Sequence, residues 1–219
     1  MPLLESTYKP PFWAKKSFVS TLFSGLARKV KGVEQTRERI TLPDTDFIDL
    51  DFSIVGSKTL VLLIHGLEGS SESKYIASNS NHLNKKGLDT VCFNLRGCSG
   101  EDNLLLSTYH SGKTEDVDFV VNYLLENYNY ENLIIIGFSL GGNLTLKYIG
   151  EQAENINSKI QGGIAVSVPI DIASAELEMD KLKNKLYIEM FFKTMKNKVL
   201  EKAFKFPEYN LDKNQLFKA

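Results

Sequence analysis

The chain has 219 residues, of which 42% are hydrophobic and 24% charged, and its formal net charge is −1 at pH 7. This length allows one sizeable domain with a real core, and the small charge gives no general attraction to nucleic acid or to an anionic membrane. The longest unbroken apolar run is Leu60–Ile64, far below the roughly 18 residues of a membrane helix. The N-terminus also lacks the charged and apolar regions of a signal peptide.

The cysteine content points to a reducing compartment. Cys92 and Cys98 lie six residues apart, and no further cysteine could complete a metal set. A disulfide framework is therefore not expected, and reduced thiols fit a cytoplasmic protein. We expect no metal and no organic cofactor.

The first part of the chain, residues 1–36, is expected to be an N-terminal arm. Apolar residues recur at helical spacing from Phe18 to Val30 and predict an amphipathic helix. Two strand-like runs follow at Arg39–Leu42 and Phe47–Val55. Pro43-Asp44 between them indicates a turn.

Strands and helices then alternate along the chain. The expected strands are Thr59–Ile64, Thr90–Leu95, Leu133–Phe138 and Ile160–Val168, and the expected helices are Lys74–Lys86, Thr114–Asn127 and Leu140–Gly150. Apolar strands that alternate with helices are typical of a mainly parallel sheet covered on both faces. We assign residues 37–172 to this α/β core.

After Pro169 the sequence shows no further strand-like run up to Phe206. Two sets of apolar residues recur at helical spacing, namely Leu182, Leu186 and Met190, and Leu200, Ala203 and Phe204. They predict amphipathic helices over residues 173–219. The lysine-rich face of this segment is expected to be solvated.

One serine stands out at the end of the third buried strand of the alternating series. Residues 137–141, GFSLG, match the pattern G-x-S-x-G, and a helical pattern follows them. A nucleophile on such a sharp turn has a strained backbone, and its flanking glycines leave room for neighbouring chain. A helix beginning at Leu140 offers unpaired N–H groups to developing negative charge. This context favours Ser139 as a nucleophile over a plain glycine-rich corner.

A second motif complements this serine. Residues 65–69, HGLEG, directly follow the strand Thr59–Ile64. In a hydrolase sheet such a loop supplies one backbone donor for the oxyanion, and the residue after the nucleophile supplies the other. These donors would be the N–H groups of Leu67 and Leu140. For the ring of His65 we favour a packing role in which it donates to a backbone carbonyl.

Two further loops carry residues that could take part in chemistry. Arg96 follows the strand Thr90–Leu95, and loop fixing is the favoured role over substrate binding. Cys98 would need a depressed pKa to act as a nucleophile, and nothing in the sequence argues for one. His110 precedes the helix at Thr114 and is favoured as a loop-orienting residue, although it is the best local candidate for a base.

Four ordered motifs carry a family resemblance: HGLEGSSESKY, NLRGCSG, YHSGKTEDV and GFSLGGN. Together they resemble the YheT-like branch of the α/β-hydrolase superfamily, over nearly the whole chain. The resemblance implies an α/β-hydrolase fold, with Ser139 as the nucleophile and residues 173–219 as the start of a helical cap over the active site. It implies hydrolysis of a carboxylic ester, or acyl transfer to an alcohol, without naming a substrate.

The chain departs from this family pattern in one respect. In this fold the triad runs in the order Ser, Asp or Glu, then His, and the family carries the acid and the histidine on loops after two further strands. All histidines of this chain precede Ser139, at positions 65, 82 and 110. The last strands and the triad acid and histidine are therefore missing. Because a serine hydroxyl without a base is a poor nucleophile, we expect this chain alone to be nearly inactive.

Three explanations remain open. The chain is an N-terminal fragment of a longer hydrolase, which we favour, or a natural non-catalytic remnant, or an enzyme with an unusual base, such as His110 or a group from another chain. A sheet without its last strands would expose an apolar edge and favour self-association. The expected function is a serine hydrolase for small carboxylic esters, with no nucleic acid partner and no integral membrane segment. The alternative is a non-catalytic binding or interaction protein with the same fold.

Overall fold

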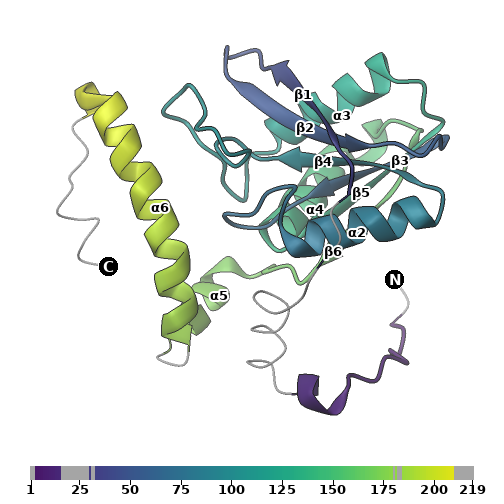
Figure 1. Cartoon of the computed structure of the whole chain (residues 1–219), viewed down its shortest axis with the longest axis horizontal. Helices are drawn as coiled ribbons and strands as arrows, with labels where there is room; N and C mark the ends of the chain where they lie inside the picture. The colour runs from purple at the N-terminus through teal and green to yellow at the C-terminus, as the bar shows by residue number, and fades with distance from the viewer. Residues whose placement is uncertain (1–2, 16–29, 31–32, 180, 182–183, 210–219) are drawn as a thin grey trace.

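The computed structural model describes residues 3–15, 30, 33–179, 181 and 184–209 (Figure 1). Most of the predicted N-terminal helix, Phe18–Val30, lies outside the described residues. The described strands form one six-stranded sheet in the order β1-β2-β4-β3-β5-β6. The arm before it contains a short 3-10 helix, η1, at Phe12–Lys15.

The sheet begins with an antiparallel hairpin of β1 (Thr36–Thr41) and β2 (Phe47–Ser53). Two ion pairs join residues that lie directly opposite each other, Arg37 with Asp51 and Arg39 with Asp49, each at 2.7 Å. Opposite charges at facing positions stabilise a strand pair and disfavour a shifted register. The charge pattern of this hairpin therefore contributes to its alignment.

The rest of the sheet is parallel and is built from β-α units. Its strands are β3 (Thr59–Ile64), β4 (Asp89–Asn94), β5 (Asn132–Phe138) and β6 (Ile160–Val166), and its helices are α2 (Lys74–Lys85), α3 (Glu115–Asn127) and α4 (Leu140–Gln152), with a 3-10 turn η3 at Ala153–Asn155. The pairs β3–β4, β3–β5 and β5–β6 are parallel, whereas β2 meets β4 antiparallel. The expected mainly parallel sheet is confirmed, with an antiparallel hairpin at one side.

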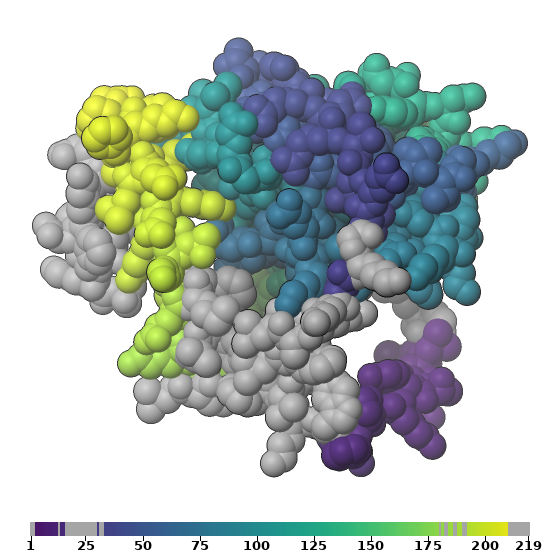
Figure 2. All heavy atoms as spheres, viewed as in Figure 1, coloured from purple at the N-terminus to yellow at the C-terminus, as the bar shows by residue number. Residues whose placement is uncertain are grey.

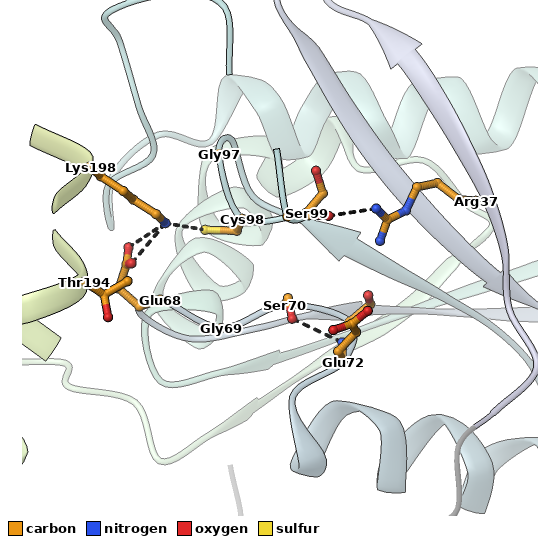
Figure 3. Close-up of a pocket in the computed structure, with 12 residues that line it drawn as sticks. Arg37, Glu68, Gly69, Ser70, Glu72, Gly97, Cys98, Ser99, Thr194 and Lys198 are labelled. Atoms are coloured by element: carbon orange, nitrogen blue, oxygen red, sulfur yellow. Dashed lines mark hydrogen bonds and ion pairs between the residues drawn. The ribbon is translucent and has the colours of Figure 1, made fainter. Parts of the chain in front are cut away.

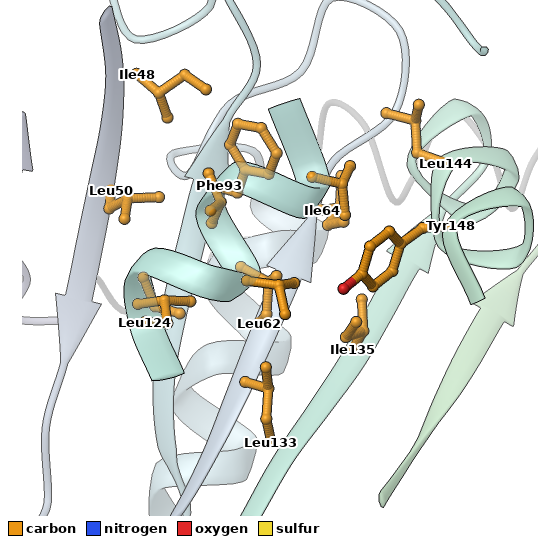
Figure 4. Packing of buried hydrophobic residues seen from close by; sticks show 14 of the residues in the cluster. Ile48, Leu50, Leu62, Ile64, Phe93, Leu124, Leu133, Ile135, Leu144 and Tyr148 are labelled. Atoms are coloured by element: carbon orange, nitrogen blue, oxygen red, sulfur yellow. The ribbon is translucent and has the colours of Figure 1, made fainter. Parts of the chain in front are cut away.

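Alternate side chains of β3 point to opposite faces of the sheet, and helices cover both faces. Leu62 and Ile64 pack in the larger core cluster with α3 and α4, which contribute Leu124 and Tyr148 among others (Figure 4). Val61 and Leu63 pack instead with residues that include Ile76 of α2. Because both faces of β3 are buried, its sequence is continuously apolar rather than alternating.

Strand β6 forms one edge of the sheet, since its described pairing is with β5 alone. Apolar side chains in its second half remain accessible: Ile164 is 51% exposed and Val166 37% exposed. The expected apolar edge is therefore present in the described part of the chain.

The C-terminal segment is helical, as the sequence predicts. It contains α5 (Ile172–Met179), α6 (Lys185–Lys205) and a 3-10 turn η5 (Pro207–Tyr209). Helix α6 lies against the loop that follows β4 (Figure 2).

The prediction of a solvated lysine face on α6 is wrong for two residues. Lys202 is only 7% exposed and donates to the carbonyl oxygens of Asn103 and Leu105, at 2.8 and 2.6 Å. Lys198 forms an ion pair with Glu68. The apolar pattern also misplaces Phe204, which is 87% exposed. The ammonium group of Lys202 binds the loop after β4, and that of Lys198 binds the loop after β3, while their aliphatic stems can pack against apolar surface.

Candidate active site

Ser139 lies on the turn between β5 and α4. Its backbone has φ 52° and ψ −116°, a left-handed conformation that non-glycine residues rarely adopt. Its N–H donates to the carbonyl of Val166 at 2.9 Å, which ties the turn to the end of β6. Ser139 is exposed, so its hydroxyl is accessible to a ligand at the carboxyl end of the parallel strands.

The glycines that flank Ser139 are required by close packing. A Cβ on Gly137 would lie 2.1 Å from the carbonyl oxygen of Gly141, and a Cβ on Gly141 would lie 2.4 Å from that of Ile64. Distances below about 3 Å are not tolerated between such atoms. The strand, the turn and the start of α4 therefore approach one another more closely than any side chain would allow.

The loop after β3 packs directly against the serine. A Cβ on Gly66 would lie 3.1 Å from Ser139 Cβ and 3.7 Å from Ser139 Oγ. Among the residues that the structure describes, neither the N–H of Leu67 nor that of Leu140 donates to a protein acceptor. Two backbone donors with unused hydrogen-bonding capacity therefore belong to segments that flank the hydroxyl.

The ring of His65 holds this loop in place. Nε2 accepts from the N–H of Leu95 at 3.1 Å, so Nδ1 carries the proton and donates to the carbonyl of Gly66 at 2.7 Å. Burial lowers the pKa of His65 to about 4, which keeps the ring neutral. Because C=O and N–H point in opposite directions across a trans peptide, this bond also orients the N–H of Leu67. The expected donation to a backbone carbonyl is confirmed.

An apolar cavity of about 520 Å³ opens beside this loop and reaches both Leu67 and Leu140. Tyr109 and Leu106 line it from the loop before α3, and Met195 and Val199 line it from α6. A cavity of this size with few polar groups suits a small ligand with an apolar part.

Arg96 is a structural residue, as the sequence analysis favours. Its guanidinium is buried and makes two 2.7 Å hydrogen bonds to Asp116 and one of 2.6 Å to Asp44. It also contacts Asp46 at 3.2 Å. Burial opposes its charge, but the bonds to Asp116 and Asp44 raise the pKa of Arg96 above its usual value. This cluster fixes the loop after β4 to the start of α3 and to the β1–β2 turn.

The cysteines offer no nucleophile. Both are free and buried, and burial raises the pKa of Cys98 to about 11 and that of Cys92 to about 12. Neither thiol is ionised to a useful extent near neutral pH. Within the described part of the chain, no group of His, Cys, Asp and Glu residues could hold a metal ion.

No base accompanies Ser139 in the described ranges. Its Oγ makes no hydrogen bond to any described residue. His110 lines the cavity, but its Nδ1 accepts from the N–H of Gly112 at 3.2 Å, in agreement with a loop-orienting role. His82 lies in the last turn of α2, and His65 is committed to backbone groups.

Sequence reasoning missed the contacts between α6 and the loop after β3. Lys198 pairs with Glu68, which also bonds with Tyr109. The partners are up to 130 residues apart in sequence, and a lysine on a helix gives no local signal of its partner. The periodic placement of Met195 and Val199 beside Lys198 was the available hint that this face is not fully solvated.

Comparisons with known proteins agree with this architecture. A family model described as the alpha/beta hydrolase fold matches residues 59–207. The crystal structure of the Pyrococcus furiosus esterase Pf2001 superposes with a TM-score of 0.58 at 24% identity, over 73% of this chain and 61% of that one. At this identity the likeness shows the fold.

Curated relatives are similar in sequence but longer. The protein named "Putative esterase YheT" of Escherichia coli is 29% identical over 174 residues, which cover 78% of this chain and 51% of the relative. Phospholipase ABHD3 of Mus musculus is 27% identical over 230 residues, 100% of this chain and 55% of the relative. Human monoacylglycerol lipase ABHD2 is 31% identical over 166 residues, 70% and 39% respectively. The chain thus spans about half the length, or less, of these relatives.

The chain belongs to the α/β-hydrolase fold family. Within that family its ordered motifs resemble the YheT-like branch, and the putative esterase YheT is similar at 29% identity over 78% of this chain. In the described part of the chain, no helix is long and apolar enough to cross a bilayer.

Proposed function

We propose that the chain carries the nucleophile and the oxyanion-binding groups of a serine hydrolase that acts on small carboxylic esters. The observation that carries the proposal is the exposed Ser139 on a left-handed strand-to-helix turn, packed against a loop with an unused backbone donor. The family, and relatives named as esterase and lipase, support ester hydrolysis as the reaction class.

In this proposal Ser139 Oγ attacks the ester carbonyl carbon. The carbonyl oxygen becomes an oxyanion that accepts from the N–H groups of Leu67 and Leu140, and the dipole of α4 favours its charge. The acyl or alcohol group with the larger apolar surface occupies the cavity beside these residues. Expulsion of the alcohol leaves an acyl-serine, which water then hydrolyses.

The proton of Ser139 has no acceptor among the described side chains. A serine hydrolase without its triad partners retains roughly 10³–10⁴-fold catalysis over water, through binding and the oxyanion hole. We therefore expect slow turnover from these 219 residues, and full activity only where a histidine and an acid are supplied to Ser139.

The same absence favours a second candidate function. A fold with an apolar cavity and a serine hydroxyl that has no partner among the described residues suits a non-catalytic protein that binds a small apolar ligand. This alternative needs no base, and it accounts equally for the cavity and for the docked helix α6.

Turnover of p-nitrophenyl butyrate separates the two functions. We expect slow hydrolysis by the wild-type chain and its loss in Ser139→Ala, with Ser158→Ala as the control at an exposed serine that precedes the start of β6. Equal rates for the wild type and Ser139→Ala would contradict the hydrolase. A ligand-induced rise in melting temperature, together with those equal rates, would favour the binding protein.

A further inference from the structure

Glu68 holds an unusual position next to the proposed oxyanion loop donor. It directly follows Leu67, and its φ of 53° lies in the left-handed region. Its side chain is only 6% exposed. A non-glycine residue adopts such a conformation only where its surroundings fix it, so the contacts of Glu68 set the course of the loop after Leu67.

Tyr109 binds Glu68 at two points. The N–H of Glu68 donates to the Tyr109 hydroxyl at 2.9 Å, and that hydroxyl donates to Glu68 Oε1 at 2.6 Å. The peptide after Leu67 is thereby fixed by Tyr109, while the peptide before it is fixed by His65. Both peptide units that flank Leu67 are held by side chains.

The third contact of Glu68 comes from the distant helix α6. Lys198 Nζ lies 3.0 Å from Glu68 Oε1 and also 3.0 Å from Oε2, and 3.6 Å from Cys98 Sγ (Figure 3). Lys198 and Glu68 also line both the apolar cavity and a second cavity of about 290 Å³. The ion pair therefore forms part of the wall between the two cavities.

Within the described residues, Lys198 is the only cation that pairs with Glu68. A largely buried carboxylate needs such a partner, because an uncompensated charge in a low-dielectric site is strongly disfavoured. If α6 moves away, Glu68 must either follow the lysine or reach solvent, and both movements disturb the left-handed turn.

We propose that Glu68 is a positioning residue of the oxyanion loop, and that Lys198 couples the docking of α6 to the geometry of that loop. Docked α6 closes the apolar cavity with Met195 and Val199 and, through the same helix turn, holds the Leu67 N–H in its productive orientation. This inference rests on the proposed function for its catalytic meaning, whereas the coupling itself does not require turnover.

Residue-resolved amide hydrogen exchange on the 219-residue chain tests the coupling. Lys198→Met should speed the exchange of the Glu68 amide by at least about fivefold, the lower range of measured coupling between sites. Lys198→Arg should restore slow exchange, and Lys193→Met, at an exposed position on the same helix, should change nothing. Because coupling is reciprocal, Glu68→Gln should speed exchange in α6, over residues 194–204.

Both directions must appear for the proposal to stand. It is overturned if Lys198→Met leaves the Glu68 amide slow, if Lys193→Met has the same effect, or if Glu68→Gln leaves α6 unchanged. Each variant is first checked for a wild-type-like melt, and Glu68→Gln keeps a hydrogen-bond acceptor for Tyr109.

Ester turnover gives an independent functional arm. If wild type and Ser139→Ala differ, Lys198→Met should lower kcat by a larger factor than it raises KM, because the oxyanion forms only in the transition state while Lys198 also lines the cavity. If wild type and Ser139→Ala are equally slow, the proposed hydrolase fails while the exchange measurement still decides the coupling.

Discussion

Replacement of Arg96 by methionine should strongly destabilise the fold. Its guanidinium joins the loop after β4 to α3 and to the β1–β2 turn, with contacts of 2.6–3.2 Å to three aspartates. The side chains of Asp46 and Asp116 are 0% and 7% exposed, whereas that of Asp44 is 41% exposed. Methionine fills similar space but leaves two buried carboxylates without their cation.

The size of the effect follows from this burial. Removal of one partner from a buried ion pair costs about 3–5 kcal/mol, because the remaining charge is uncompensated. Burial opposes the charge of Asp46, and hydrogen bonds from Asn103 and from backbone N–H groups hold its pKa below the usual value. These bonds remain in Arg96→Met and limit the loss at Asp46. For a chain of this size the melting temperature should fall by roughly 6–20 °C.

Urea unfolding at pH 7 measures the loss directly. Lys58→Met is the matched control, because Lys58 and Glu131 form an ion pair with side chains 77% and 60% exposed, and such solvent-exposed pairs contribute little to stability. A loss in Arg96→Met no larger than in Lys58→Met would refute the reasoning that burial decides the role of this arginine.

Three further predictions concern the core and the sheet edge. The pKa of His65 is about 4 in the folded chain and about 6.5 in an unfolded chain. Between these pH values the unfolded state binds more protons than the folded state, so the free energy of unfolding should fall as the pH drops from 6.5 to 4. The loss approaches about 3 kcal/mol, and His65→Gln should lack this part of the slope in urea unfolding. Gly141→Ala should destabilise the fold by about 1–3 kcal/mol or more, because the added Cβ would overpack against backbone carbonyls. Gly150→Ala places its Cβ with nothing within 4 Å and should stabilise α4 by about 0.5–1 kcal/mol. Equal effects of the two substitutions in thermal melts would contradict the packing argument. Ile164→Lys on the open strand β6 should reduce self-association measured by light scattering, and a wild-type chain that is already monomeric would show the expected association to be wrong.

The arrangement of the core could be predicted because local patterns determine it. Continuous apolar runs such as Leu60–Ile64 indicate strands buried on both faces, and the helix Thr114–Asn127 shows one apolar face. Alternation of the two element types then restricts the topology to parallel β-α units. The observed bounds of β3, β5 and α3 agree with the expected ones to within one residue.

The role of the helix after the core could not be predicted in the same way. A lysine on an amphipathic helix is compatible with solvent, with an ion pair or with a buried carbonyl, and only its tertiary neighbours decide. Lys202 donates hydrogen bonds to backbone carbonyls about 100 residues earlier in the chain, and Lys198 forms an ion pair with Glu68 in the wall of the cavity. The partners of Arg96 are similarly non-local, although its loop-fixing role was the favoured expectation.

The central claim is that Ser139 is the nucleophile, and an active-site-directed phosphonate ester tests it most directly. Such a reagent bonds covalently to a serine that is held ready for attack, and peptide mass spectrometry locates the adduct. We expect slow labelling confined to Ser139, lost in Ser139→Ala and unchanged in Ser158→Ala. Labelling at another residue, or equal labelling of the wild type and Ser139→Ala, would contradict it.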